Sequence, residues 1–195
     1  MFHVAIVGRP NVCKSALLNR LVRKTVSIVH DQPGITRDRI SAVVEHGKAT
    51  FEFVDTGGIG LFESKTTPAD IAQAVQMQVE IAIESADLIL MVVDGLEGVR
   101  PLDQEISAKL RRRGKKLWLI VNKLDFPMHE VRAAEFSQLG LDPVFSVSAS
   151  HGRGIDHLWH ELQQAASVLQ PSALSFQPSG SKVPAPRIAI VGRPN

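Results

Sequence analysis

Short apolar runs alternate along this chain with segments whose apolar residues recur at helical spacing. Runs typical of strands buried in a parallel sheet lie at 4–7, 88–94, 116–122 and 144–147. The stretches 40–45 and 49–54 flank His46-Gly47-Lys48 and predict an antiparallel hairpin. Helices are predicted at 16–22, 68–86, 101–110, 130–139 and 155–169.

This alternation predicts an α/β fold with a doubly wound, mostly parallel sheet and one antiparallel edge strand. In such sheets ligands bind at the carboxyl ends of the strands. Four polar loops begin where predicted strands end, at Gly8, Asp55, Asn122 and Ser148. The pattern therefore predicts one ligand site built from these four loops.

The first loop has the spacing of the phosphate-binding pattern G-x-x-x-x-G-K-[ST]. It reads Gly8, Arg9, Pro10, Asn11, Val12, Cys13, Lys14 and Ser15. Backbone N–H groups of such a loop surround a phosphate, with the positive end of the next helix behind them. We expect Lys14 to reach the β- and γ-phosphates and the Ser15 hydroxyl to hold Mg²⁺. Cys13 departs from the pattern, which has glycine at that position.

Two later loops are suited to read a base. In Asn122-Lys123-Leu124-Asp125, the carboxylate can accept hydrogen bonds from the N1–H and amino group of guanine, a donor pair that adenine lacks. A site built for such donors rejects the analogue without them by about 10⁴-fold or more. We expect the Asn122 amide to bond the imidazole edge and the Lys123 stem to cover the ring. Backbone N–H groups that we expect to meet guanine O6 belong to Ser148, Ala149 and Ser150.

Two loops are expected to respond to the γ-phosphate. Asp55 begins the stretch Asp55-Thr56-Gly57-Gly58-Ile59 and is expected to hold Mg²⁺ through water, while the Gly58 N–H contacts the γ-phosphate. Thr36 follows the turn Pro33-Gly34 and is expected to close on Mg²⁺. Loss of the γ-phosphate would then release both loops.

The composition is that of an ordinary globular protein. The 195 residues are enough for one domain with a sizeable core, and the net charge of +2 permits a nucleic-acid partner without requiring one. The single cysteine excludes an internal disulfide and fits a reducing compartment. Because no apolar run is long enough for a signal peptide or a membrane span, we expect a cytoplasmic protein.

A repeat suggests more than one domain. Residues 189–195, Ala-Ile-Val-Gly-Arg-Pro-Asn, repeat residues 5–11 letter for letter. The preceding residues are rich in Pro, Ser and Gly, as flexible linkers are. We therefore predict a nucleotide-binding domain over 1–169, a flexible linker over 170–186, and the first strand and truncated phosphate loop of a second such domain over 187–195.

Together these motifs resemble those of the translation-factor-class GTPases, and in particular the Der (EngA) family of bacterial ribosome-assembly GTPases with two consecutive G domains. The resemblance covers essentially the whole chain and rests on residues 33–38, on Asp55-Thr56-Gly57-Gly58 and on the repeated Gly-Arg-Pro-Asn. It implies GTP hydrolysis coupled to assembly of the large ribosomal subunit. It further implies Mg²⁺ with GTP or GDP, contacts to that subunit or its rRNA, and a second G domain and a KH-like domain in the full-length chain. It gives phosphate, magnesium, switch or guanine-reading roles to Lys14, Ser15, Thr36, Asp55, Asn122, Lys123 and Asp125.

Two positions bear on the rate of hydrolysis. Ile59 stands where Ras-like proteins carry the glutamine that orients the attacking water, so we expect slow intrinsic hydrolysis. Related GTPases with an asparagine in the phosphate loop use K⁺ as the missing positive charge, and Asn11 occupies that position. Stimulation by K⁺ is therefore a hypothesis, with Asn11, Lys14, Thr36 and Gly58 as the catalytic set.

Cys13 leaves a second function open. A side chain in place of the glycine is expected to strain the loop or crowd the phosphates, and so to weaken nucleotide binding. The alternative is thus a nucleotide-impaired, regulatory G domain, crippled or redox-gated at Cys13, that acts as an interaction module. A third hypothesis, a P-loop ATPase or kinase, is disfavoured by residues 122–125.

Two further groups of residues have ordinary explanations. Arg111-Arg112-Arg113 with Lys115 and Lys116 would suit an RNA contact, but a solvated helix end is the favoured interpretation. His157 and His160 share a helical face, and exposed histidines are favoured there over a metal site.

Overall fold

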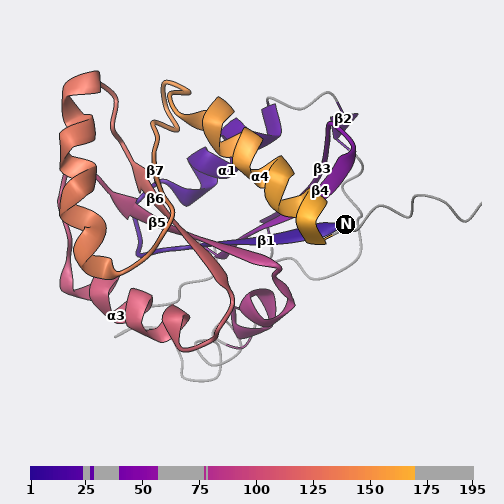
Figure 1. Ribbon diagram of the computed structural model, residues 1–195, viewed down its shortest axis with the longest axis horizontal. Helices are drawn as coiled ribbons and strands as arrows, with labels where there is room; N and C mark the ends of the chain where they lie inside the picture. The colour runs from indigo at the N-terminus through magenta and orange to yellow at the C-terminus, as the bar shows by residue number, and fades with distance from the viewer. Residues whose placement is uncertain (24–26, 29–39, 57–76, 78, 170–195) are drawn as a thin grey trace, which may run out of the picture.

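One seven-stranded sheet organises the part of the chain that the structure describes (Figure 1). The computed structural model describes residues 1–23, 27–28, 40–56, 77 and 79–169. In this part of the chain the strand order is β2-β3-β4-β1-β5-β6-β7. The strands are β1 (Phe2–Val7), β2 (Ser27–Ile28), β3 (Ile40–His46), β4 (Ala49–Asp55), β5 (Leu88–Asp94), β6 (Lys116–Asn122) and β7 (Val144–Ser146).

The sheet is parallel except at one end. Strand β1 pairs in parallel with β4 and β5, and β6 pairs in parallel with β5 and β7. Strand β3 runs antiparallel to β4, to which the turn at Gly47 joins it, and the two-residue β2 lies antiparallel on its outer side. The predicted fold class is confirmed, and β3 is the strand that runs against the others, although β2 rather than β3 lies at the edge of the sheet.

Each face of the sheet is covered by its own core. In β1, Val4 and Ile6 belong to one apolar cluster, whereas Ala5 and Val7 belong to the other, because successive side chains of a strand point to opposite faces. Helices α1 (Lys14–Arg23) and α4 (Ile155–Leu169) cover the first face in Figure 1. The helical residues 79–85 and α3 (Pro101–Arg111) cover the second. Trp159 of α4 lies in the first core, as its place on the apolar stripe predicts.

One predicted helix has a different form. The segment expected to be helical at 130–139 is a 3₁₀ helix, η2 (Pro127–Leu139), that ends at Gly140 in the left-handed region. Its inward residues Ala133, Phe136 and Leu139 are three positions apart and pack on the second core. That spacing matches the three residues per turn of a 3₁₀ helix, so packing accounts for the tighter winding.

Several sequence predictions fall outside the described residues. They include the loop with Thr36, the stretch Gly57-Gly58-Ile59, and the proposed linker and second domain over 170–195. Of the helix predicted at 68–86, only Met77 and 79–86 are described, and Val79, Ile83 and Ala86 are buried there as the stripe predicts. The strand predicted at 144–147 ends at Ser146.

Candidate functional site

The predicted loops meet at the carboxyl end of the parallel strands. A hydrogen bond joins Asn122, at the end of β6, to the loop between β1 and α1. A second one joins Asn122 to the loop that follows β7. A third joins Ser15, on α1, to Asp55 at the end of β4. Segments far apart in sequence therefore form one continuous site, as the topology predicts.

Gly8 brings the phosphate loop close to the sheet. A β-carbon on Gly8 would lie 2.3 Å from the carbonyl oxygen of Val92 in β5, which is too close for any side chain. Val12, on the far side of the loop, is completely buried. The loop is therefore held at both ends, by close backbone packing and by an apolar anchor.

Two residues of this loop have backbone angles that favour glycine. Asn11 has a φ of 65° and Cys13 a φ of 63°, both in the left-handed region. A side chain makes that region costly, by about 1–2 kcal/mol per residue, although asparagine tolerates it better than most. The exposed Cys13 thus shows why the general pattern has glycine here: the backbone must turn left just before α1 begins.

Lys14 lies inside the loop. Its ammonium donates hydrogen bonds to the carbonyl oxygens of Gly8 (2.9 Å) and Arg9 (2.8 Å), and the residue is only 6% exposed. Burial lowers the pKa of Lys14 from its usual value, against the opposing attraction of the Asp55 carboxylate. The loop thus encloses a positive charge that burial disfavours and that a nearby anion would stabilise.

Ser15 and Asp55 form a pair of oxygen groups beside Lys14. The Ser15 hydroxyl donates to Asp55 Oδ2 at 2.5 Å, and Asp55 is fully buried. Alcohol and carboxylate oxygens are the ligand types that Mg²⁺ prefers, so this donor set fits the predicted magnesium site. The neighbouring Thr56 hydroxyl donates to the carbonyl oxygen of Ile6 at 2.7 Å, which fastens the end of β4 to β1.

Asn122 links three loops through one amide. Its Nδ2 donates to the Val12 carbonyl oxygen at 2.9 Å, and its Oδ1 accepts the Ala149 N–H at 3.0 Å. The side chain is 1% exposed, so both contacts lie in a dry environment where they matter most. Asn122 is therefore first a structural link between the phosphate loop and the base-reading loops.

The backbone of 148–150 is partly engaged within the protein. The Ser148 N–H donates to the Arg153 carbonyl oxygen (3.0 Å), and the Ala149 N–H donates to Asn122. Of the three groups expected to meet guanine O6, only the Ser150 N–H has no acceptor among the described residues. The Arg20 side chain of α1 donates hydrogen bonds to two carbonyl oxygens of this loop, those of Ala149 (2.8 Å) and Ser150.

Asp125 is held with its carboxylate charged. The Ser148 hydroxyl donates to Asp125 Oδ1 at 2.6 Å, and His151 Nδ1 lies 3.2 Å from the same oxygen. The Ser148 hydrogen bond, with support from His151, lowers the pKa of Asp125. By contrast, the Leu124 side chain is buried in the second core, so Leu124 positions the motif without facing the site.

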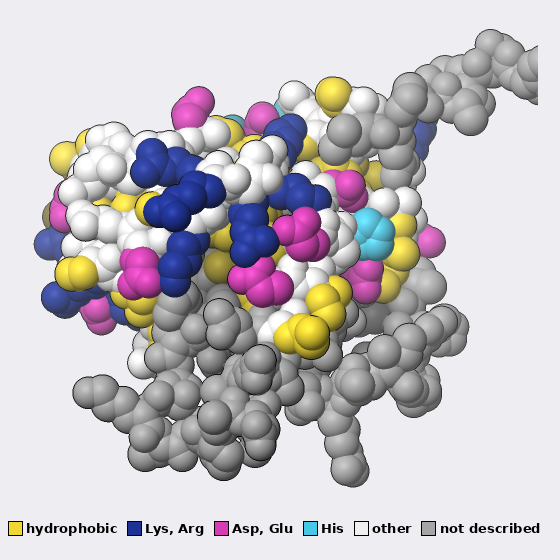
Figure 2. All heavy atoms as spheres, turned by 90° about the horizontal axis from the view of Figure 1, so that it is seen from below, with side chains coloured by type: hydrophobic (Ala, Val, Ile, Leu, Met, Phe, Trp, Pro, Cys, Tyr) yellow, Lys and Arg dark blue, Asp and Glu magenta, His cyan; other side chains and the backbone are white. Residues whose placement is uncertain are grey.

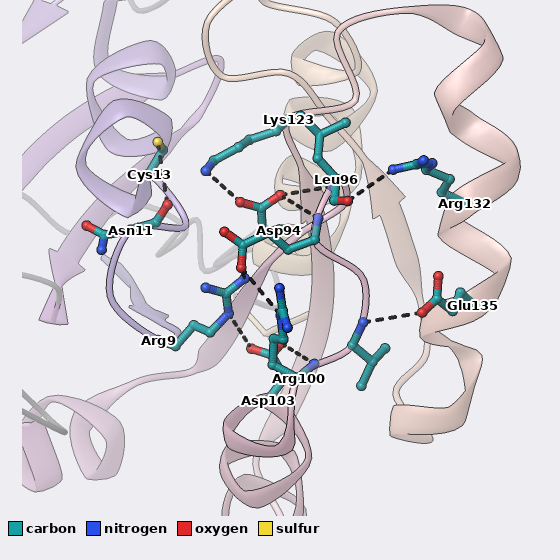
Figure 3. Close-up of polar contacts among 12 residues, drawn as sticks. Arg9, Asn11, Cys13, Asp94, Leu96, Arg100, Asp103, Lys123, Arg132 and Glu135 are labelled. Atoms are coloured by element: carbon teal, nitrogen blue, oxygen red, sulfur yellow. Dashed lines mark hydrogen bonds and ion pairs between the residues drawn. The ribbon is translucent and has the colours of Figure 1, made fainter.

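Lys123 extends across the site toward the phosphate loop (Figure 3). Its φ of 69° is left-handed, and its ammonium lies 2.5 Å from Asp94 Oδ2 at the end of β5. Burial opposes the charge on Asp94, but the Lys123 ammonium and the N–H groups of Leu96 and Glu97 lower the pKa of that carboxyl. The same pair raises the pKa of Lys123, so both groups stay charged at neutral pH.

Sequence reasoning missed four residues that shape this site. They are Asp94, Glu97, Asp103 and His151. A signal for Asp94 was present, since it ends the buried run 88–94 at the same edge as the predicted loops. The other three lie on loops or inside a helix, where no spacing rule marks them.

Relatives of this chain show which family it represents. The sequence model of the 50S ribosome-binding GTPase family matches residues 3–123. The chain belongs to this family. GTPase Der of Methylacidiphilum infernorum is 43% identical over 98% of this chain and 39% of its own length. GTPase Der of Syntrophotalea carbinolica is 44% identical over 98% of this chain and 42% of its own length. The predicted resemblance to the Der GTPases is thus confirmed, and the chain spans about two fifths of these relatives.

A solved structure supports the fold of the GTPase domain. Era in complex with MgGDPNP and nucleotides 1506–1542 of 16S ribosomal RNA superposes with a TM-score of 0.69 and 31% identity, over 84% of this chain and 56% of that one. An Aquifex aeolicus Era variant bound to GDP and AlF₄⁻ matches over the same shares with the same score. The phosphate loop and the loops at 122–125 and 148–150 therefore belong to a GTPase-family fold.

Among the described residues, Arg113 is the member of the basic cluster at 111–116 that pairs with carboxylates, while Lys115 donates to the backbone carbonyl oxygens of Glu84 and Ala86. Figure 2 shows Lys and Arg side chains gathered on this face, with Asp and Glu side chains among them. Arg113 pairs with Glu84 (2.8 Å) and Glu80, and Lys109 pairs with Glu105 (2.8 Å). These pairs favour the interpretation of a solvated helix end.

The described residues hold neither a metal-binding cluster nor a membrane-spanning helix. Those residues contain no group of three or more His, Cys, Asp and Glu side chains placed to hold a metal ion, and His157 and His160 are exposed. No helix in the described part of the chain is long and apolar enough to cross a membrane.

Proposed function

We propose that this GTPase-family domain binds GTP and GDP with Mg²⁺ and hydrolyses GTP. The observation that carries the proposal is the hydrogen bond from Asn122 to the Val12 carbonyl, which couples the base-reading loop to the phosphate loop. A ligand that spans both loops must carry a base at one end and phosphates at the other. The coupling gives each end of such a ligand a fixed position relative to the other.

At the phosphate end, this chain supplies charge and oxygen ligands. We propose that the Lys14 ammonium exchanges its contacts with the Gly8 and Arg9 carbonyls for the β- and γ-phosphates, with Thr36 and Gly58 completing the site. Ser15 and Asp55 would hold Mg²⁺ between them and the nucleotide. Bound there, Mg²⁺ would neutralise charge on the phosphate oxygens.

At the base end, we propose that Asp125 selects guanine. Its lowered pKa keeps it an acceptor for the N1–H and amino group. Nδ2 of Asn122 carries two protons, and the contact with Val12 uses one, so the second remains for the imidazole edge. The Ser150 N–H, which has no acceptor among the described residues, would meet O6. Lys123 would cover the ring from its anchored position beside Asp94.

Calorimetric titration with GDP, GTP and ATP tests this function. We expect both guanine nucleotides to bind and ATP not to bind. Asp125→Asn should lose GDP binding and gain xanthosine diphosphate, because xanthine has an oxygen where guanine has its amino group. The exposed Glu45→Gln is the control and should bind GDP like the unmodified chain. Equal binding of ATP and GDP would contradict the proposal.

We further propose that hydrolysis is slow on its own and is stimulated by K⁺. Asn11 supports this, because it is an exposed residue of the phosphate loop. Ile59 offers no group to orient water. Rates of phosphate release in K⁺ and in Na⁺ at equal ionic strength provide the test, and equal rates would contradict the K⁺ hypothesis.

For the whole protein, we propose a role in assembly of the bacterial large ribosomal subunit. The support is the family itself and the similarity to GTPase Der. The described fold over 1–169 supports a first G domain, and the repeat of 5–11 at 189–195 supports a second one after a linker at 170–186. Partners would be the subunit or its rRNA and a KH-like domain. Co-sedimentation of the full-length protein with purified large subunits, with GDPNP against GDP, tests this role.

One observation favours a second candidate function. Cys13 holds a left-handed backbone that glycine would adopt more easily. A nucleotide-impaired G domain that serves as an interaction module is therefore the alternative. The same titration separates the two, because rescue of GDP binding by Cys13→Gly would favour the impaired domain.

A further inference from the structure

Arg9 reaches out of the phosphate loop toward α3. Its Nη2 lies 2.9 Å from Glu97 Oε2, and its Nε lies 3.4 Å from Asp103 Oδ1 (Figure 3). Although arginine is strongly polar, this side chain is only 11% exposed. The loop is thus tied through a desolvated guanidinium to the segment between β5 and α3.

Asp103 is the buried end of this tie. Its side chain is 0% exposed, and its Oδ2 accepts the Arg100 N–H at 3.0 Å, which caps the start of α3. That leaves Oδ1 for Arg9 Nε, which lies 3.4 Å away. This contact is an ion pair and not a hydrogen bond, and among the described residues neither atom has a hydrogen-bond partner. Burial raises the pKa of Asp103 against the pull of the Arg100 N–H and the Arg9 charge. The charge of Asp103 is thus buried, and the Arg9 guanidinium is the cation that faces it.

The phosphate loop needs outside support. Asn11 and Cys13 both occupy the left-handed region, and such conformations persist only when the surroundings impose them. One side of the loop is tied by Asn122 to Val12. On the other side the Arg9 carbonyl oxygen accepts a hydrogen bond from the Lys14 ammonium at 2.8 Å. The Arg9 side chain extends from the loop to Glu97 and Asp103.

We propose that Asp103 is a positioning residue for nucleotide binding, which through Arg9 holds the phosphate loop in the left-handed turn at Cys13. The inference rests on the proposed nucleotide binding. It requires that Asp103 matter more when residue 13 carries a side chain than when it is glycine. A merely structural role in α3 would not depend on the residue at position 13.

The test is GDP affinity in four proteins: the unmodified chain, Asp103→Asn, Cys13→Gly and the double variant. Asparagine keeps the shape and one oxygen but removes the charge that attracts Arg9. We expect Asp103→Asn to weaken GDP binding about tenfold in the unmodified chain, equivalent to about 1.4 kcal/mol. In the Cys13→Gly background we expect a loss below about threefold. Glu105→Gln, an exposed change on the same helix, should alter neither affinity.

Equal losses in both backgrounds, or no loss in either, would overturn the inference. If neither the unmodified chain nor Cys13→Gly binds GDP, it is the proposed nucleotide binding that fails. Should Asp103→Asn not fold, as judged by its thermal midpoint, Glu97→Gln removes only the pair of Arg9 with Glu97 and is the control for Arg9→Gln, which removes the pairs with both Glu97 and Asp103. Arg9→Gln must show the same dependence on residue 13, and an equal loss in both backgrounds would again refute the role of Asp103.

Discussion

The side-chain amide of Asn122 lies 2.9 Å from the carbonyl oxygen of Val12, although 110 residues separate them in sequence. This contact joins the loop suited to a base to the loop suited to phosphates. Because Asn122 also accepts the Ala149 N–H, one side chain sets the relative positions of three loops.

Removing the Asn122 amide should therefore loosen the whole site. Asn122→Ala leaves the Val12 carbonyl and the Ala149 N–H without partners, at about 1–3 kcal/mol each. We expect the free energy of unfolding to fall by about 3 kcal/mol in a urea titration. The exposed Asn19→Ala on α1 is the matched control and should change stability by less than about 0.5 kcal/mol. A small effect at Asn122 would mean that the loops are held elsewhere.

Cys13→Gly should relieve the backbone of the phosphate loop. The left-handed φ of 63° costs an L-residue about 1–2 kcal/mol, while glycine loses about 0.5–1 kcal/mol of chain entropy on folding. We expect a net gain of about 0.5–1 kcal/mol in the free energy of unfolding and tighter GDP binding by calorimetry. Cys13→Ala keeps the β-carbon and should show neither gain. If Cys13→Ala showed the same gains as Cys13→Gly, the cost at this position would come from the sulfur atom and not from the left-handed backbone.

Nucleotide binding should weaken at alkaline pH because of Lys14. Burial lowers its pKa below 10.5, so in the free protein the ammonium loses its proton before an ordinary lysine would. Phosphates favour the charged form, so above that lowered pKa binding must take up a proton and GDP affinity must fall. Calorimetry from pH 7 to 10 in two buffers of different ionisation enthalpy measures both effects.

Lys14→Arg is the control for this titration. Arginine stays protonated over the whole range. GDP binding to this variant, although weaker at pH 7, should therefore take up no proton at pH 9–10. The stability of the unliganded protein should change with pH in the opposite direction to the GDP affinity. The charged lysine is disfavoured by burial in the fold, so stability should rise as pH increases from the folded pKa toward 10.5. A flat GDP affinity over this range would contradict the assigned contact between Lys14 and phosphate.

The ion pair of Asp94 with Lys123 should stabilise the fold in a pH-dependent way. Its 2.5 Å contact and the 2% exposure of Asp94 predict that Asp94→Asn lowers the free energy of unfolding at pH 7 by about 1.5–3 kcal/mol. Because the pair lowers the pKa of Asp94, its contribution is present above 3.8 and is lost as pH falls through the folded pKa.

Urea titrations at pH 7 and pH 3 measure this difference. The gap between Asp94→Asn and the unmodified chain should narrow at pH 3, because this pH lies below the ordinary pKa of 3.8 and the carboxyl of the unfolded state takes up its proton. Glu105→Gln removes an exposed pair with Lys109 and should cost less than about 0.5 kcal/mol at either pH. An unchanged gap would mean that packing, not charge, makes Asp94 important.

The sequence alone determined the fold class and the convergence of the predicted loops at one edge of the sheet. Continuous apolar runs such as 88–94 specify strands buried on both faces, and the alternation of strands with helical spacing specifies a mostly parallel sheet. Because parallel strands end at one edge, the residues after them had to converge, and Ser15 with Asp55 and Asn122 with Val12 do so. These predictions rest on local periodicity and on the geometry of parallel sheets, which the sequence carries directly.

Only the tertiary structure decided how the site is held. The left-handed angles of Asn11, Cys13 and Lys123 stand at residues that seldom adopt them, so the residue types did not indicate them. The ties of Arg9 to Asp103 and of Lys123 to Asp94 join positions 94 and 29 residues apart, for which no spacing rule exists. The 3₁₀ winding of η2 likewise follows from which residues meet the core. Such choices depend on the packing of whole elements against one another, so they appear only when the chain is folded.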